Sequence, residues 1–493
     1  MVNPGKAAFF KQLEASGIAV TFDDVRLRTI VAAQKRIASS DTDTTSRFSR
    51  NVSLKVPIVS SPMDTVTESD MAIAMAMMGG LGIVHGALSI EAQAAEVRRV
   101  KLYRNGLIED PIVVQQSDSV ASVLAMRSRY KHEFSTFPVV DDGHRFVGMF
   151  TQTDADYCQD TSQLVKQHMT PIEQVVYAPA SITPQAAFDV MRHNGKLNTL
   201  PLVRQDGTLA GLYIKSDVLR VINDNPNNYN LDENGRLRVG AAVPTDPDEA
   251  LARVAALGPH VDVLVIDTAN GNSPYMFETL KRLKKATSLD IVAGNVSEGS
   301  SARLLAEAGA DGIRVGQGGG SICTTRKETG IGTPQVTAIY ECARAVEEFN
   351  IPVCADGGLK DKGDIPIALA AGAESVMMGN MLAATKESPG QLLILENGKM
   401  VMEYRGMGSQ SALRDNAASR KRYGSGNGPI LPEGVEAQLP YKGSVRDVLP
   451  VYSAALRKAM EYVGAATIGA LRQDSLFWRI TNAGLRESHP HDV

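Results

Sequence analysis

The chain has 493 residues, which allows about three domains at roughly 150 residues each, although one α/β barrel can take up ~250 of them. Its 51 basic and 55 acidic residues nearly balance, and only 5% of residues are aromatic, so the composition lacks the basic surface of proteins that bind nucleic acid or anionic membranes. Four scattered cysteines fit neither a disulfide framework nor a zinc site. The N-terminal segment lacks a signal pattern, and no apolar run of about 18 residues occurs. We expect a soluble, cytoplasmic protein.

Short apolar runs alternate with amphipathic runs along most of the chain. Buried strands are predicted at residues 56–64, 79–86, 261–271, 289–295, 311–320, 351–358 and 374–380. Helices are predicted at 272–287, 300–310, 337–350 and 364–373. Strands that are apolar almost throughout indicate a parallel sheet covered by helices on both faces. Gly, Asn and Asp cluster where nearly every strand ends, which favours a (β/α)8 TIM barrel over an open doubly wound sheet.

An internal repeat interrupts this alternation. Residues 137–154 match residues 200–217 at a constant offset of 63 without a gap. Each copy predicts two short strands around a turn, closed by an aspartate, Asp154 or Asp217, that can cap the next helix. The repeat resembles a tandem CBS pair, a regulatory module inserted into the barrel.

Three segments follow from the repeat. Residues 1–107 and 230–493 form the two parts of a catalytic barrel, and residues 108–229 form the tandem CBS domain. Paired CBS motifs resemble adenine-nucleotide sites in which an aspartate holds ribose hydroxyls, so the resemblance implies a purine-nucleotide effector at Asp154 and Asp217. The alternative is an insert that only stabilises the fold.

Two segments after the barrel strands differ in kind. Residues 392–404 predict two strands joined by Asn397-Gly398 in a type I′ turn. Residues 414–434 are rich in Gly, Ser, Asn and charge and have no apolar period, which predicts a disordered segment or a mobile lid.

The sharpest local feature is the glycine-rich segment GQGGGSICTTR, residues 316–326, called here the Cys loop. Its glycines let the backbone approach a ligand, and the residues after them supply amide and hydroxyl donors. Cys323 lies among Gly, Ser, Thr and Arg, a partly exposed setting that favours the thiolate. Cys342 and Cys354 lie in a predicted helix and a predicted strand, where a cysteine usually serves as a small apolar side chain.

A series of motifs carries a family resemblance over essentially the whole chain. SSPMDTVTES, VIDTANGNS, AGNV, GSICTTR, ADGG, MMGN, YRGMGS, PEGVE, YKGS and AGLRESHPHDV occur in this order. They resemble the inosine-5′-monophosphate (IMP) dehydrogenase family with its inserted CBS pair. The sister family, guanosine-5′-monophosphate (GMP) reductase, is also similar and shares a stretch like TTRKETGIGTPQ. Pro62, in SPMDTVTE where reductases resemble NMDTV, favours the dehydrogenase. The Arg422-Tyr423 pair also favours it and is decisive, because only the dehydrogenase has a water to activate.

The resemblance implies a two-step reaction, the committed step of guanine nucleotide synthesis. The Cys323 thiolate adds to C2 of IMP, hydride passes to NAD+, and water then hydrolyses the thioimidate to xanthosine 5′-monophosphate (XMP). A flap at about residues 404–443 would deliver Arg422 as the general base with Tyr423 beside it. Thr325 and Glu433 resemble a second route for the proton.

The resemblance also assigns the binding residues. Those of the substrate are Ser321, Asp356, Gly358, Gly379, Asn380, Tyr404, Met407, Gly408 and Glu433. Asp356 would hold the ribose, and the 5′-phosphate would lie on backbone N–H groups and hydroxyls. Those of the dinucleotide are Asp267, Asn295, Arg314, Gly316 and Gly318.

Three positions depart from the family pattern. Gly319 stands where the family usually has Pro or Ser, which should loosen the Cys loop. Asn380 stands where a serine commonly meets the phosphate, and the segment around Ala87 lacks a frequent asparagine.

A monovalent cation and an assembly are implied as well. The carbonyls of Gly318, Gly320 and Cys323 resemble half of a K+ site, which Glu487, Ser488 and His489 of a neighbouring copy of this chain would complete. The family forms homotetramers, and octamers are a further form. GMP reductase with NADPH, a nucleotide-sensing CBS scaffold and an assembly or filament protein are the alternative functions.

Overall fold

The computed structural model describes residues 4–29, 37–104, 106–108, 111–129, 136–223, 225–416, 419–420, 423 and 431–490. Contacts divide the chain into two compact units, one of residues 1–101 and 227–493 and the other of residues 102–226. The sequence placed the corresponding boundaries at 107/108 and 229/230. Within the described residues, no helix has the length and apolar character needed to cross a membrane.

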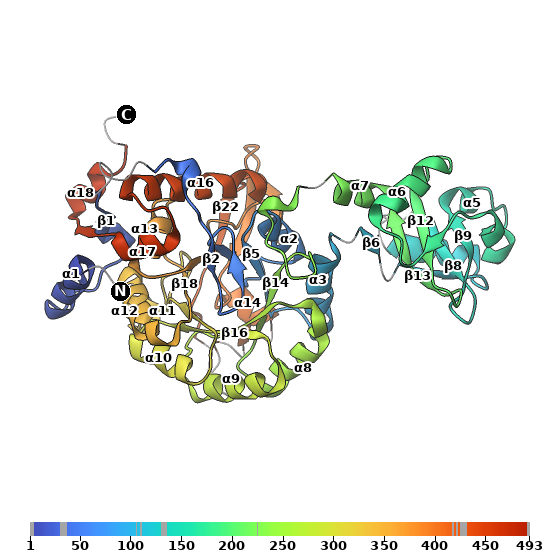
Figure 1. Cartoon of the computed structure of the whole chain (residues 1–493). Helices are drawn as coiled ribbons and strands as arrows, with labels where there is room; N and C mark the ends of the chain where they lie inside the picture. The colour runs from blue at the N-terminus through green and yellow to red at the C-terminus, as the bar shows by residue number, and fades with distance from the viewer. Residues whose placement is uncertain are drawn as a thin grey trace. The chain divides into compact units, whose positions relative to one another are not determined.

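The larger unit is a closed barrel of parallel strands in the order β14-β15-β16-β17-β18-β19-β4-β5 (Figure 1), which confirms the predicted TIM barrel. The strands are β4 (Ile58–Ser60), β5 (Leu81–Val84), β14 (Val239–Val243), β15 (Val263–Asp267), β16 (Asp290–Val296), β17 (Gly312–Val315), β18 (Val353–Asp356) and β19 (Ser375–Met378). Nearly all of their residues are buried, as the apolar runs predicted.

A helix follows each barrel strand. These are α2 (Ser69–Met77), α3 (Ile90–Leu102), α8 (Pro247–Leu257), α9 (Pro274–Ala286), α10 (Gly299–Glu307), α12 (Gln335–Ala345), α13 (Asp364–Ala371) and α16 (Val445–Val463). Two of them begin with a capping side chain followed by proline: Asp246 accepts from the N–H of Glu249, and Ser273 accepts from that of Met276. The cap and the proline together set the first residue of each of these two helices.

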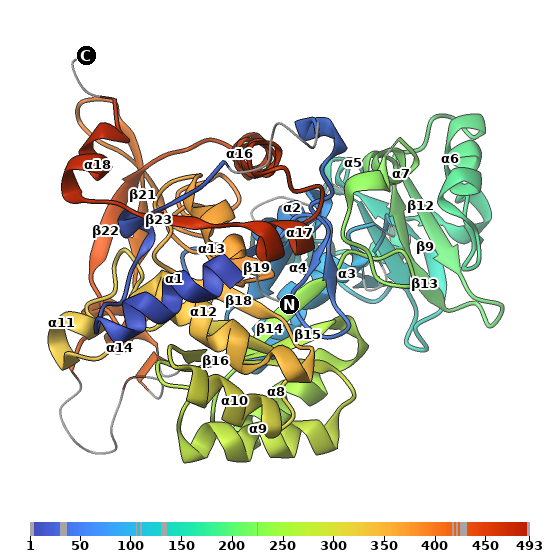
Figure 2. The ribbon, with the colours of Figure 1, turned by 60° about the vertical axis from the view of Figure 1, so that its left-hand side comes forward.

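The amino-terminal end of the barrel is closed by local structure. The hairpin of β2 (Ser46–Arg47) and β3 (Ser53–Leu54) places Phe48 in the same buried cluster as the barrel strands. The first helix, α1 (Pro4–Ala15), packs on α12, where the rings of Phe10 and Tyr340 stack at 3.8 Å between centroids (Figure 2).

The peripheral elements of this unit come from both ends of the chain. They are β1 (Val25–Leu27), paired antiparallel with β23 (Phe477–Arg479), and the helices α17 (Ile468–Asp474) and α18 (Asn482–Glu487).

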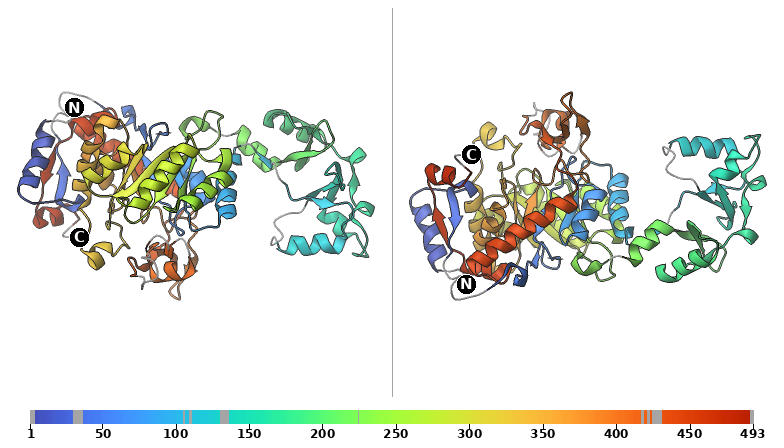
Figure 3. Two further views of the ribbon diagram at one scale, coloured as in Figure 1. Left: turned by 90° about the horizontal axis from the view of Figure 1, so that it is seen from below. Right: turned by 90° about the horizontal axis from the view of Figure 1, so that it is seen from above.

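Between β19 and α16 the chain makes an antiparallel sheet of β20 (Leu392–Ile394), β21 (Met400–Arg405) and β22 (Glu436–Pro440), with α14 (Gln410–Asp415) near it in sequence. The sheet stands off one side of the barrel (Figure 3). The predicted hairpin is confirmed, but its type I′ turn is wrong. The Gly398 N–H donates to Leu395 O, and Gly398 alone has a positive φ, so the central residues of the turn are Glu396 and Asn397.

The smaller unit consists of two similar halves. One sheet has the order β10-β9-β8-β7 and the other β11-β12-β13-β6. Their strands are β6 (Leu107–Ile108), β7 (Val114–Gln115), β8 (Thr136–Val140), β9 (Phe146–Thr151), β10 (Thr170–Pro171), β11 (Ala178–Pro179), β12 (Thr199–Val203) and β13 (Leu209–Ile214). The helices are α4 (Val120–Arg129), α5 (Gln152–Asp156), α6 (Pro184–His193) and α7 (Lys215–Ile222). Strands β8 and β9 recur as β12 and β13 at the repeat's offset of 63 residues.

The repeated aspartates lie in the first turns of the helices that close each copy. Asp154 Oδ2 accepts from the N–H and the hydroxyl of Thr151 at 2.7 and 2.8 Å, and the Asp154 N–H donates back to that hydroxyl. The N-cap is therefore Thr151, and Asp154, predicted to cap the helix, is instead the third helical residue that completes the capping box. Asp217 takes the corresponding place in α7.

Candidate active site

The main cavity of the barrel unit opens at the carboxyl ends of its strands. It measures about 990 Å³ up to its open mouth. Its walls come from the segments that follow β4, β15, β16, β17, β18 and β19, together with residues near Tyr404 and Glu433. Among the predicted site residues, it is lined by Asn295, Arg314, Gly316, Gly318, Gly320, Ser321, Cys323, Thr325, Asp356, Gly358, Gly379, Asn380, Tyr404, Met407, Gly408, Tyr423 and Glu433.

The Cys loop is held in place by the segment around Glu433. Cys323 pairs with Gly434 in an antiparallel bridge, and the Thr324 N–H donates to Glu433 O at 3.0 Å. These bonds join residues more than 100 positions apart in the sequence and bring the side chain of Glu433 over the start of α11 (Thr325–Thr329).

Three side chains then form a hydrogen-bonded series, called here the proton relay. Cys323 Sγ lies 3.1 Å from Thr325 Oγ1, and Thr325 Oγ1 donates to Glu433 Oε2 at 2.6 Å. Because a hydroxyl has one hydrogen and Thr325 gives it to the carboxylate, the Cys323 thiol is the donor to Thr325. The geometry provides a path for the thiol proton to the Glu433 carboxylate.

The other cysteines of the barrel lie apart from this chemistry. Cys342 is buried within α12 and Cys354 within β18, and burial raises the pKa of both thiols, that of Cys354 to about 12. Both therefore stay protonated at neutral pH.

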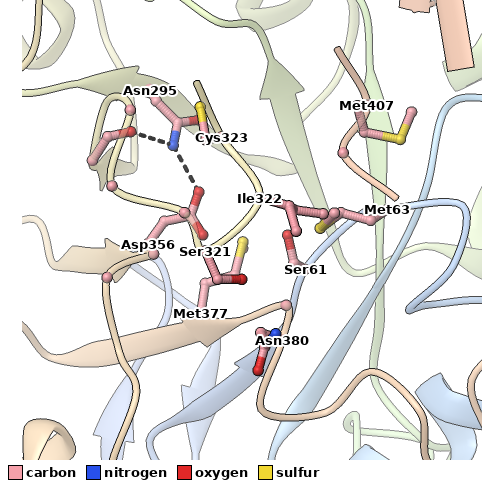
Figure 4. A pocket seen from close by; sticks show the side chains of 18 of the residues that line it. Ser61, Met63, Asn295, Ser321, Ile322, Cys323, Asp356, Met377, Asn380 and Met407 are labelled. Carbon is pink, nitrogen blue, oxygen red and sulfur yellow. Dashed lines mark hydrogen bonds between the residues drawn. The ribbon is translucent and has the colours of Figure 1, made fainter. Parts of the chain in front are cut away.

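A buried ion-pair network underlies the cavity. Arg314, 3% exposed, reaches Asp267 Oδ1 at 2.6 Å and Asp356 Oδ2 at 2.9 Å. Burial by itself lowers the pKa of Arg314, but the charges of Asp356 and Asp267 outweigh it and leave that pKa above its usual value. Asn295 Nδ2 also donates to Asp356 Oδ2, at 2.7 Å, and to Gly316 O, at 2.9 Å (Figure 4). Among the described residues, the Asp356 side chain accepts hydrogen bonds only at Oδ2, so Oδ1 is available to a ligand.

The hydroxyl of Tyr404 lies in the same cavity as the other residues predicted to bind the phosphate. Burial raises the pKa of Tyr404 to about 12, so its hydroxyl stays protonated at neutral pH and can donate a hydrogen bond. A Cβ at Gly379 would lie only 2.9 Å from this hydroxyl, which explains the glycine. Next to it, Lys442 Nζ donates to Asn380 O, and burial lowers the pKa of Lys442 to about 8. Sequence reasoning did not single out Lys442, although it lies in the quoted YKGS motif.

The flap residues are described in part. The ring of Tyr423 packs against Gly408, where a Cβ would lie 3.0 Å from two ring atoms. Arg422 lies outside the described residues.

The remaining predicted residues do not line the cavity. Asp267 lies behind it, paired with Arg314. Glu487, Ser488 and His489 lie on the exposed end of α18 and beyond it. Asp154 and Asp217 belong to the smaller unit.

Sequence reasoning did not assign some cavity residues that the structure shows. Ser61 and Met63 follow β4, Met377 belongs to β19, and Gln317 lies in the Cys loop. Ser61 and Met63 belong to the quoted SSPMDTVTES motif, which offered a signal. Met377 reads as an ordinary buried strand residue.

Comparison with known proteins identifies the family to which the chain belongs. The family model "IMP dehydrogenase / GMP reductase domain" matches residues 19–491. The chain belongs to the IMP dehydrogenase/GMP reductase family.

Its relatives include proteins of both names. It is 42% identical to the inosine-5′-monophosphate dehydrogenase of Halalkalibacterium halodurans over 96% of each chain. It is 43% identical to that of Aquifex aeolicus, over 96% of this chain and 95% of the relative. A solved structure, the GMP reductase of Trypanosoma brucei in complex with guanosine 5′-monophosphate, superposes with a TM-score of 0.80 at 37% identity, covering 97% of this chain and 99% of that one.

Proposed function

We propose that this chain is an NAD-dependent IMP dehydrogenase that oxidises IMP to XMP through a covalent intermediate on Cys323. The proton relay from Cys323 through Thr325 to Glu433 is the observation that carries the proposal. The identity to dehydrogenases over nearly the full chain supports it.

The reaction balances with the residues at hand. The Cys323 sulfur bonds to C2 of the purine, and its proton passes through Thr325 to Glu433. NAD+ supplies the acceptor for the hydride that leaves C2, and a thioimidate remains on the enzyme. Water then adds to C2 and loses a proton, and the C2–S bond breaks. IMP, NAD+ and water become XMP, NADH and a proton.

The base for the water step is proposed from the family resemblance. Arg422, with Tyr423 beside it in the sequence, removes the proton, and Thr325 with Glu433 forms a second route. The position of Tyr423 against Gly408 in the cavity supports the role of this segment.

Substrate contacts follow the chemistry of each group. Ser321, Gly358, Gly379, Asn380 and Tyr404 offer N–H and O–H donors to the 5′-phosphate. Asp356 accepts the ribose hydroxyls, and the backbone at Met407 and Gly408 meets the base.

The dinucleotide would lie against Asn295, Arg314, Gly316 and Gly318, with Asp267 behind the cavity wall holding Arg314 in place. One observation fits such a ligand: Asn295 Oδ1 is buried at the cavity and has no hydrogen-bond donor among the residues that the structure describes. A hydroxyl or amide of a ligand would satisfy it.

A K+ ion would be held by the carbonyls of Gly318, Gly320 and Cys323, and by Glu487, Ser488 and His489 of a neighbouring copy of the chain. Oxygen donors suit a hard monovalent ion. Turnover in K+, Na+ and cation-free buffer tests the site, and equal rates would remove it.

GMP reductase is the second candidate. The stretch TTRKETGIGTPQ and the superposition on the Trypanosoma brucei enzyme favour it. One pair of assays separates the two: IMP with NAD+ should raise the absorbance of the reduced nicotinamide, whereas GMP with NADPH would lower it and release ammonia. No change of absorbance in either assay, in a protein that still binds ATP or GTP, would indicate a nucleotide-sensing scaffold.

The remaining proposals concern regulation and assembly. The smaller unit is proposed as a CBS pair that binds a purine nucleotide at Asp154 and Asp217. The enzyme is proposed to be a cytoplasmic homotetramer that can assemble further into octamers. Titration with ATP or GTP tests the nucleotide site. Light scattering with and without the nucleotide tests the assembly.

A further inference from the structure

A buried glutamine lies behind the Cys loop. Gln335, the first residue of α12, is 1% exposed. Its Nε2 donates to Val315 O at 2.9 Å and to Asp356 O at 3.1 Å, the last residues of β17 and β18. Because two carbonyl oxygens face the nitrogen, the orientation of the amide is fixed and Oε1 must point the other way.

That oxygen has no hydrogen-bond donor among the described residues, although it is buried. Gly319 of the Cys loop lies near this oxygen: a Cβ built on Gly319 would lie 3.6 Å from Gln335 Oε1 and 3.8 Å from Gly358 N. A buried acceptor without a donor is destabilising, so a state of the loop that supplies a donor is favoured. Gly319 has a backbone N–H, which a proline at this position would lack.

The Cys loop also packs against Gly357 and Gly358. Gly358 and Ser321 belong to the residues predicted to bind the phosphate, called here the phosphate cradle. A Cβ at Gly357 would lie 3.3 Å from Gly320 N, and one at Gly358 would lie 3.5 Å from Gln335 Cβ. Ser321 belongs to the same loop, so a phosphate bound to both Ser321 and Gly358 would hold the loop against the segment next to Gln335.

We propose that Gln335 is a positioning residue for the Cys loop: its Oε1 accepts the Gly319 N–H when a nucleotide phosphate occupies the cradle. This rests on the proposed function only in taking a purine nucleotide 5′-monophosphate as the ligand. The bond holds the loop that carries Cys323 in one position, and Nε2 ties the same side chain to the strand end that carries Asp356.

Gly319 offers a matched pair of variants. Gly319→Pro removes the N–H. Gly319→Ala keeps the N–H, its φ is not in the left-handed region, and its Cβ would meet neighbours at 3.5 Å or more, which are ordinary contacts. Gln335→Met removes Oε1 at similar volume, together with the Nε2 bonds to Val315 O and Asp356 O.

Nucleotide binding without dinucleotide is the decisive measurement. Calorimetric titration with IMP, and in parallel with GMP, should show about fivefold weaker binding for Gly319→Pro than for Gly319→Ala, the value of one neutral hydrogen bond. Gly319→Ala should bind as the unaltered chain does. In the Gln335→Met background, Gly319→Pro should cause no further loss, because the bond is already gone.

Equal affinities of the proline and alanine variants would overturn the proposal, as would a full additional loss in the double variant. The Gly319 pair decides the matter even if Gln335→Met does not fold. Binding of GMP with turnover by NADPH would contradict the dehydrogenase, while the same comparison, made with GMP, would still test the role of Gln335.

Discussion

Replacing Thr325 by valine tests the proton relay with little change of shape. Valine is nearly isosteric with threonine but has no hydroxyl, so the 3.1 Å contact to Cys323 and the 2.6 Å bond to Glu433 are both lost. The backbone bonds that hold the Cys loop, such as Thr324 N–H to Glu433 O, do not involve this side chain. The variant should fold, and its thiol should lose its path to the carboxylate.

The expected loss follows from the nature of these bonds. A hydrogen bond to a charged group contributes ~1.5–3 kcal/mol, which corresponds to ~10–150-fold in rate. General acid–base catalysis contributes ~10²–10⁴-fold. Because Arg422 is proposed as a separate base for the water step, we expect the loss mainly in the first step, by about 10²-fold.

Stopped-flow measurement of NADH formation separates the two steps. The burst should slow about 10²-fold in Thr325→Val, and Thr325→Ser, which keeps the hydroxyl, should stay within about fivefold of the unaltered chain. A burst in Thr325→Val as fast as in the unaltered chain would refute the relay. So would a serine variant as slow as the valine variant.

Three further predictions concern other parts of the chain. Gly379→Ala places a Cβ 2.9 Å from Tyr404 Oη, so the KM for IMP should rise about tenfold in steady-state assays; an unchanged KM would show that this site does not hold the phosphate. Burial lowers the pKa of Lys6 from 10.5 to about 8, so between these pH values the unfolded chain binds a proton that the folded chain does not. The free energy of unfolding should therefore rise with pH over this window by up to ~3 kcal/mol relative to Lys6→Met, and denaturant titrations that give parallel pH profiles would contradict the assignment. Asp154→Ala removes the capping bonds to Thr151 and should lower the stability of the smaller unit by ~1 kcal/mol in calorimetry and weaken ATP or GTP binding, with IMP turnover unchanged; unaltered nucleotide affinity would remove the proposed effector site.

Local sequence patterns predicted the barrel well because its strands obey local rules. β16 is buried at every residue and contains the apolar stretch at residues 291–294, and β8 and β12 reproduce the repeat at its predicted offset. The turn after β20 was predicted wrongly, because Asn397-Gly398 fits a type I′ turn equally well and only the backbone hydrogen bond to Leu395 decides between the two turns.

The site was predictable where a motif carried it and not where distant segments meet. Cys323 stands out by its neighbours in sequence, but its link to Glu433 depends on a β-bridge that no local pattern announces. The pairing of Arg314 with Asp267 and Asp356 likewise arises from three strands closing into a barrel. Gln335 reads as an ordinary helix start, and only its burial shows its contact with the strand ends.

The central claim is a covalent purine adduct on Cys323, and mass spectrometry tests it most directly. Arg422→Ala mixed with IMP and NAD+ should release about one NADH per site and then stall, since hydride transfer does not need the proposed base. The acid-quenched, digested protein should carry the purine nucleotide on the peptide that contains Cys323, and Cys323→Ala should carry none and form no NADH. An unmodified peptide at the end of the burst would contradict the account, as would a burst slowed as much as the steady state.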